Sequence, residues 1–157
     1  MNDVLASADY TRWVLPALLA IPLLGAIGLW VHGALTRGDV TPDGAHSRLN
    51  TARWMALVTF VVLFVVSLGL WWAFDPTTAR WQATFDAPWI PAWNARLTMG
   101  IDGISLVMIL LTTLLMPLTV LGSWSSIRRS PHAYYALMLV LTTGMLGVFV
   151  ALDLLLF

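Results

Sequence analysis

Apolar residues in this chain fall into four long runs, separated by stretches that are polar or rich in turn-forming residues. The runs cover about residues 13–35, 54–74, 103–124 and 134–152. A helix needs about 20 mostly apolar residues to cross a hydrocarbon core of about 30 Å. The pattern therefore predicts an all-α, polytopic transmembrane protein with four spans.

The run at 54–74 is the clearest of the four, with twelve Leu, Val or Phe residues. On the membrane-insertion scale such residues sum to about −4 to −7 kcal/mol, which favours a span over a buried soluble helix. A further apolar stretch, 154–157, follows Asp153 and is too short to cross. We expect it to be the start of a fifth span.

The connection at 75–102 differs from the other loops because it contains Trp81, Phe85, Trp89 and Trp93 among prolines and glycines. Large aromatic side chains favour the headgroup level of a membrane. We therefore expect an ordered interfacial loop, and the sequence leaves open whether it is a β-hairpin or a short surface-lying helix.

Composition strengthens the membrane assignment, since 59% of residues are hydrophobic and 10% are charged. All eight basic residues are Arg, all eight acidic residues are Asp, and cysteine is absent. The absence of cysteine excludes disulfides, thiolate catalysis and Cys-ligated clusters in this chain. The zero net charge, without a basic run, argues against a nucleic-acid partner.

Arginine placement predicts that the N-terminus lies outside, because cytoplasmic loops carry an excess of basic residues. In that orientation five arginines lie inside, namely Arg37, Arg48, Arg53, Arg128 and Arg129. Three lie outside, namely Arg12, Arg80 and Arg96.

Three ionisable residues are candidates for a proton path. Asp102 directly precedes the third run, where it is either a helix cap or a functional carboxylate. Asp153 follows the fourth run and is either a turn residue or a proton entry or exit group. His32, near the end of the first run, is a weaker candidate for a relay than for packing. We find no nucleophile–base pair, metal-ligand set or nucleotide fingerprint, and predict no catalytic, cofactor or metal site within the chain.

Two blocks of sequence resemble the antiporter-like subunit M family of bacterial NADH–quinone oxidoreductase, respiratory complex I. The first consists of FDAPWIP at 85–91, GIDGISL at 100–106 and Ser-Trp at 123–124. The second runs over 134–157. The resemblance follows the order of the spans along nearly the whole chain and is most specific over 85–157.

This resemblance implies a multi-pass subunit of the bacterial inner membrane, with other membrane subunits and the lipid bilayer as partners. It implies proton translocation coupled to quinone reduction. Quinone, FMN and iron–sulfur clusters would belong to partner subunits. The family's pump residues are a glutamate early in the fifth helix and lysines in later helices, and both are expected beyond Phe157. Residues 1–157 would then be a single membrane segment, the N-terminal fragment of a longer subunit.

Two alternatives stay open at this point. The chain also resembles subunits of multi-subunit sodium/proton antiporters and membrane-bound hydrogenases, which share the motif at 100–106 in varied form. Alternatively, because the four spans contain almost no ionisable residues, the chain could be a self-contained structural or assembly protein.

Overall fold

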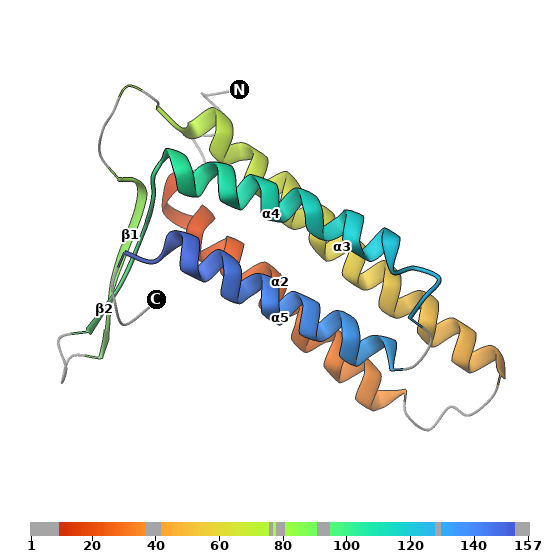
Figure 1. The fold of residues 1–157 in the computed structure, drawn as a ribbon. Coiled ribbons are helices and arrows are strands. Elements are labelled where there is room, and N and C mark those ends of the chain that lie inside the picture. The colour runs from red at the N-terminus through yellow and green to blue at the C-terminus, as the bar shows by residue number, and fades with distance from the viewer. Residues whose placement is uncertain are drawn as a thin grey trace.

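A computed structural model of the chain describes residues 10–36, 42–75, 77, 81–90, 95–127 and 130–152. These ranges contain four long helices and a two-stranded antiparallel sheet. The helices are α2 (Tyr10–Leu35), α3 (Pro42–Ala73), α4 (Gly103–Gly122) and α5 (Pro131–Val150). The strands are β1 (Gln82–Ile90) and β2 (Ala95–Ile101). The helices run side by side, and the β-hairpin lies at one end of the bundle (Figure 1).

Each helix contains a stretch that is long and apolar enough to cross a membrane. These stretches are Trp13–Leu35, Leu49–Ala73, Gly103–Gly122 and Pro131–Val150. The predicted class, a polytopic helical membrane protein, is therefore confirmed. Helix α3 begins at Pro42, well before its apolar stretch. Its first turns are polar and extend the helix beyond the part that would lie in lipid.

The outer surface of the bundle is apolar, as a membrane requires. Only 28% to 33% of the apolar window of each span is buried within the bundle. Large side chains such as Leu24, Trp30 and Leu35 are 66%, 69% and 80% exposed. Exposing so much hydrocarbon surface to water is unfavourable, whereas contact with lipid tails or with further helices is not.

Helix packing places α2 against both α5 and α3, and α4 against α3. The core is made of fully buried Leu, Phe, Tyr and Ile side chains from all four helices, among them Leu15, Leu18, Phe60, Leu63, Ile109, Tyr135 and Leu139. The helices continue through Pro16, Pro22 and Pro117. Such prolines are tolerated in membrane helices because neighbouring groups and local adjustments re-satisfy the freed carbonyls.

The segment between α3 and α4 is a β-hairpin, which decides between the two structures that the sequence left open. Asp86 lies opposite Thr98 in the register, and a bulge occurs next to Ala83, whose φ is 51°. On β2, Met99 and Ile101 are 3% and 1% exposed. The hairpin is thus joined to the bundle by apolar contacts from alternate residues of β2.

The chain beyond α5 returns to this hairpin. Ala151 forms an isolated antiparallel bridge with Met99, and the N–H of Leu152 donates to the carbonyl of Thr98 at 3.0 Å. A side chain at Gly100 would meet Leu152, since a Cβ there would lie 2.7 Å from Leu152 Cδ1. The end of α5 is therefore fixed to the hairpin by backbone hydrogen bonds and close packing.

Candidate functional site: a histidine pair at one end of the bundle

Two histidines from different spans meet at the end of the bundle opposite the hairpin. Nδ1 of His32, in the last turn of α2, lies 3.0 Å from Nε2 of His132, the second residue of α5. The imidazole rings are stacked, with centroids 5.1 Å apart and planes at 22°. A hydrogen bond at this distance needs one nitrogen to donate and the other to accept, so the two rings cannot both be fully protonated while it exists.

The local sequence explains why the two rings come so close. Pro131 begins α5, and Ser130 precedes it in the left-handed region with φ 52°. Across the interface, Gly33 has no side chain, and a Cβ there would lie 2.8 Å from Cβ of His132. Glycine at this position lets α2 and α5 approach closely enough for the imidazoles to touch.

The two histidines differ in exposure. His132 is 6% exposed and is one of four buried polar residues in the described part of the chain. His32 is half-buried. The pair therefore has one ring inside the bundle and one ring within reach of the surrounding medium.

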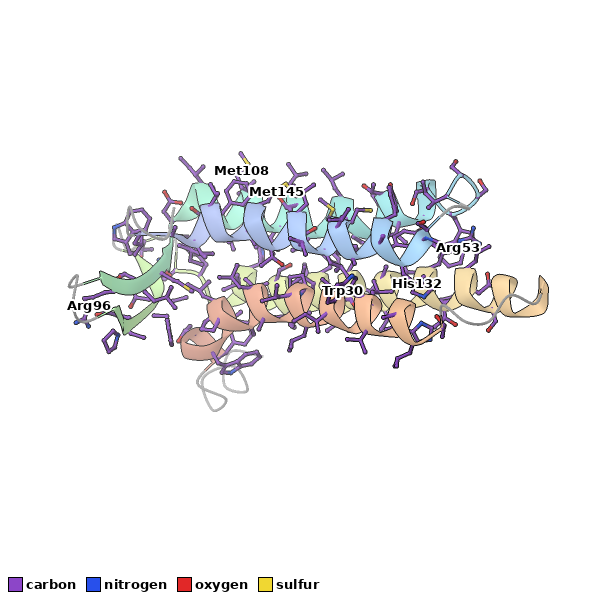
Figure 2. The ribbon with its side chains drawn as sticks, turned by 90° about the horizontal axis from the view of Figure 1, so that it is seen from below. Trp30, Arg53, Arg96, Met108, His132 and Met145 are labelled. Atoms are coloured by element: carbon purple, nitrogen blue, oxygen red, sulfur yellow. The ribbon has the colours of Figure 1, made fainter. Side chains whose placement is uncertain are left out.

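Arg53 of α3 lies at this same end and joins the loop between α4 and α5 to the bundle. Its Nη2 donates to the carbonyl of Ile127 at 3.4 Å, and its guanidinium carbon lies 5.6 Å from the ring centroid of Trp124. Trp54 makes an edge-to-face contact with Trp124, with centroids 5.5 Å apart. Figure 2 shows Arg53 and His132 at one end of the molecule and Arg96 at the other. In the orientation predicted from the arginines, the histidine end faces the cytoplasm.

The other buried polar side chains of the bundle are hydroxyls that bond within the protein. Ser67 and Thr113 bond to each other at 2.7 Å, and Thr142 donates to the carbonyl of Met138 at 2.8 Å. Within the described residues, no three His, Cys, Asp or Glu side chains gather as a metal cluster would require. The interior described here thus offers hydroxyls and one imidazole, but no carboxylate or amine.

Asp102 lies at the opposite end from His32, immediately before α4. Its carboxylate accepts the N–H of Ser105 at 2.7 Å, the geometry of an N-cap. This hydrogen bond holds the pKa of the Asp102 carboxyl below its usual value. The structure therefore accounts for Asp102 as a cap, while a role in a proton path stays a prediction.

The remaining candidate, Asp153, lies outside the described residues. Sequence reasoning did not single out His132, which completes the pair with His32. A signal was present, because both histidines are near span ends on the same predicted side of the membrane. The sequence contained nothing to say that the first and fourth spans are neighbours.

The fold and its apolar surface define a multi-pass membrane protein. Residues 47–152 match the family model of the amino terminus of NADH-ubiquinone oxidoreductase chain 4. The chain belongs to this family. Together with the four spans, this makes it a multi-pass protein of the inner membrane.

Individual relatives agree with this assignment. NADH-quinone oxidoreductase subunit M of Escherichia coli K12 is 33% identical over 150 residues, which are 92% of this chain and 27% of the relative. Subunit M of Rhodobacter capsulatus is 45% identical over 108 residues, 69% of this chain and 20% of the relative. NADH-ubiquinone oxidoreductase chain 4 of Triticum aestivum is 40% identical over 111 residues, 71% of this chain and 22% of the relative. The chain thus spans between a fifth and just over a quarter of the length of these relatives.

Proposed function

We propose that this chain forms the N-terminal helices of an antiporter-like subunit of NADH–quinone oxidoreductase, and that the whole subunit translocates protons when quinone is reduced. The observation that carries the proposal is the family match over 47–152, which covers three of the four spans and the hairpin. Other membrane subunits would be its partners. FMN, iron–sulfur clusters and the quinone site would lie in those partners, in keeping with the absence of cysteine here.

Within that subunit, the four helices would act as scaffold around a proton path. A side-chain relay through a membrane needs ionisable groups at depth. The described spans hold no Asp, and their deep polar contacts, such as Ser67 with Thr113, are between hydroxyls. The groups that change protonation in each cycle would therefore come from other helices. Asp102 and Asp153 remain candidates for a proton path, Asp153 as an entry or exit group, and His32 is a weaker candidate for a proton relay.

The test is to delete the gene that encodes this chain and to measure NADH-driven proton uptake by inverted membrane vesicles. We expect uptake to fall to the level of uncoupled vesicles and to return when the gene is restored on a plasmid. A parallel assay of NADH-independent sodium/proton exchange distinguishes this function from the alternative, a subunit of a sodium/proton antiporter. If that exchange is lost while NADH-driven uptake persists, the proposal is wrong.

The structural or assembly alternative needs a second readout, the amount of intact complex in the membrane. A matched pair of variants serves this purpose, one in the core interface (Ser67→Leu) and one on the apolar surface (Leu24→Ile). We expect the core variant to lower the amount of assembled complex and proton uptake together. The surface variant should leave both near the wild-type level.

A further inference from the structure

We propose that His32 and His132 form a two-histidine binding site for a transition-metal dication of the Zn²⁺ class, bridging α2 and α5. This inference does not depend on the proposed function. It rests on the placement of two imidazole nitrogens from different helices 3.0 Å apart. Neutral imidazole is a favoured ligand for zinc, copper and nickel.

The distance between the nitrogens is close to what a shared metal ion needs. Zn–N bonds of about 2.0–2.1 Å at a tetrahedral angle place two ligand nitrogens roughly 3.3–3.4 Å apart. The pair would have to open by only a few tenths of an ångström from 3.0 Å, with small ring rotations that turn both lone pairs toward the ion. Two imidazoles fill two of the four positions of a tetrahedral ion and leave two for other ligands; among the described residues no third His or acid gathers at the pair.

The surroundings of the pair hold it in position before any ion arrives. His132 is 6% exposed, and Gly33 fits against its Cβ and ring, so its imidazole is confined by packing. His32 is half-buried, so its ring is the more exposed of the two. A ligand pair that is already assembled loses little conformational entropy on binding.

The hydrogen that lies between the two rings has to leave that position before a metal ion can bind. In the apo pair, one N–H lies between the two nitrogens, whereas both nitrogens must present lone pairs to a metal ion. When both rings are neutral, the bridging hydrogen moves to the other nitrogen of its own ring by exchange with water, and no proton is released. When one ring is protonated, binding releases one proton.

The experiment uses the membrane complex that contains this chain, purified from its native membrane. Metal ions are removed from the complex with EDTA, and it is then titrated with ZnCl₂ against a chromophoric zinc indicator. The variants are His32→Gln and His132→Gln, which keep a polar side chain of similar length but remove the imidazole. The control is His46→Gln, which removes the third histidine of the chain. Far-ultraviolet circular dichroism and the amount of intact assembly verify that each variant is folded.

We expect wild type and the His46 variant to bind one more Zn²⁺ per chain than either pair variant. Loss of an outer-shell partner of a metal ligand typically costs about 10–100-fold in affinity, so loss of a ligand should cost at least about tenfold. The double variant should bind no fewer ions than either single variant. If wild type and both pair variants bind the same number of ions with the same affinity, the site does not exist. If only the His46 variant loses an ion, the site lies elsewhere in the chain.

Discussion

Ser67 and Thr113 meet in the buried interface between α3 and α4, where their hydroxyl oxygens lie 2.7 Å apart. Both residues are fully buried. Each hydroxyl is also within hydrogen-bonding distance of a carbonyl of its own helix, Phe64 at 2.8 Å for Ser67 and Ile109 at 2.9 Å for Thr113. One hydrogen can therefore be used between the helices while the other is used within a helix, and neither oxygen is left without a partner.

We expect this interhelical hydrogen bond to contribute modestly to stability. Because each hydroxyl keeps its backbone acceptor when the other is removed, Ser67→Ala and Thr113→Val should each be tolerated. A double-mutant cycle should give a coupling of about 0.6 kcal/mol, and not above about 1.7 kcal/mol, the range for such bonds in membrane helices. The measurement is unfolding in mixed micelles of rising SDS content. A coupling indistinguishable from zero would mean that the two hydroxyls do not bond across the interface.

The contact between Gly33 and His132 predicts a larger effect. In the variant Gly33→Ala, the new methyl group would lie 2.8 Å from Cβ and 3.0 Å from Cγ of His132. These atoms are close to the backbone of α5 and cannot move as a flexible chain end would. We expect α2 and α5 to separate and the protein to lose about 1–3 kcal/mol, as overpacked cores do.

Gly144→Ala is the matched control, because a Cβ at Gly144 meets no atom within 4 Å. Its expected effect on unfolding in SDS micelles is small in either direction. The two substitutions add the same methyl group to the middle or end of a span, so the comparison isolates the close helix contact. Equal stability of the two variants would show that α2 and α5 do not pack as described.

The hydrophobic runs of the sequence predicted the helices well. A continuous apolar run about as long as a membrane crossing forms a helix because a helix satisfies all its backbone hydrogen bonds within one segment. The hydrophobic runs could not predict which spans are neighbours. The membrane-spanning parts of all four helices are apolar on every side, so no hydrophobic stripe marks the face that packs inward. The contact between α2 and α5, and with it the pairing of His32 and His132, is decided by small residues such as Gly33 that a single sequence does not distinguish from other glycines.

The interfacial loop at 75–102 shows a second limit of prediction from the sequence. Its aromatic residues indicated an ordered segment, but a hairpin and a surface helix have the same preference for the headgroup level. The hairpin depends on contacts far along the chain, including the bond from Leu152 to the carbonyl of Thr98. For Asp102, by contrast, the position before an apolar run was enough to suggest the cap that the structure contains.

The hairpin carries an ion pair whose effect should appear in the titration of Asp86. Arg96 donates from Nη2 at 2.6 Å and from Nε at 2.9 Å, and this hydrogen bonding holds the pKa of the Asp86 carboxyl below its ordinary value. The folded state thus binds this proton more weakly than the unfolded chain. The pair therefore contributes stability above the ordinary Asp pKa of about 3.9, and that contribution is lost as the pH falls through the lowered pKa.

The carboxyl ¹³C shift of Asp86, followed against pH in selectively labelled protein, tests this prediction. In Arg96→Gln the pKa of Asp86 should return toward about 3.9. Arg53→Gln, at the opposite end of the molecule (Figure 2), should leave it unchanged. A pKa that is the same in wild type and in Arg96→Gln would mean that the ion pair is not formed in solution.

Tyr10, which precedes the first apolar span, should titrate at unusually high pH. Its hydroxyl donates to the carbonyl of Val66, and burial raises its pKa to about 12. Folding therefore favours the neutral phenol. The stability from this group is fully present below the ordinary pKa of about 10 and declines as the pH rises toward 12. The difference in phenolate absorbance between wild type and Tyr10→Phe isolates this group, and a midpoint near 10 would contradict its burial.

Asp102 offers a test that separates a structural role from a role in proton transfer. As the N-cap of α4 it accepts the N–H of Ser105 at 2.7 Å, and an amide oxygen can replace the carboxylate in that bond. Asparagine is about as good an N-cap as aspartate, whereas loss of the cap to alanine costs about 0.5–2 kcal/mol. We therefore expect Asp102→Asn to keep most of the stability in SDS micelles and Asp102→Ala to lose about 1 kcal/mol.

Proton uptake by vesicles from strains that carry Asp102→Asn or Asp102→Ala distinguishes a helix cap from a proton-transfer group, because asparagine has no proton to exchange in this pH range. If Asp102 acts only as a cap, Asp102→Asn should translocate protons at nearly the wild-type rate per assembled complex. If the carboxylate takes part in proton transfer, Asp102→Asn should fail although it is folded and assembled, and Asp102→Glu should restore part of the rate. The hydrogen bond to Ser105 lowers the pKa of Asp102, so its carboxylate is ionised at neutral pH, and this favours the first outcome.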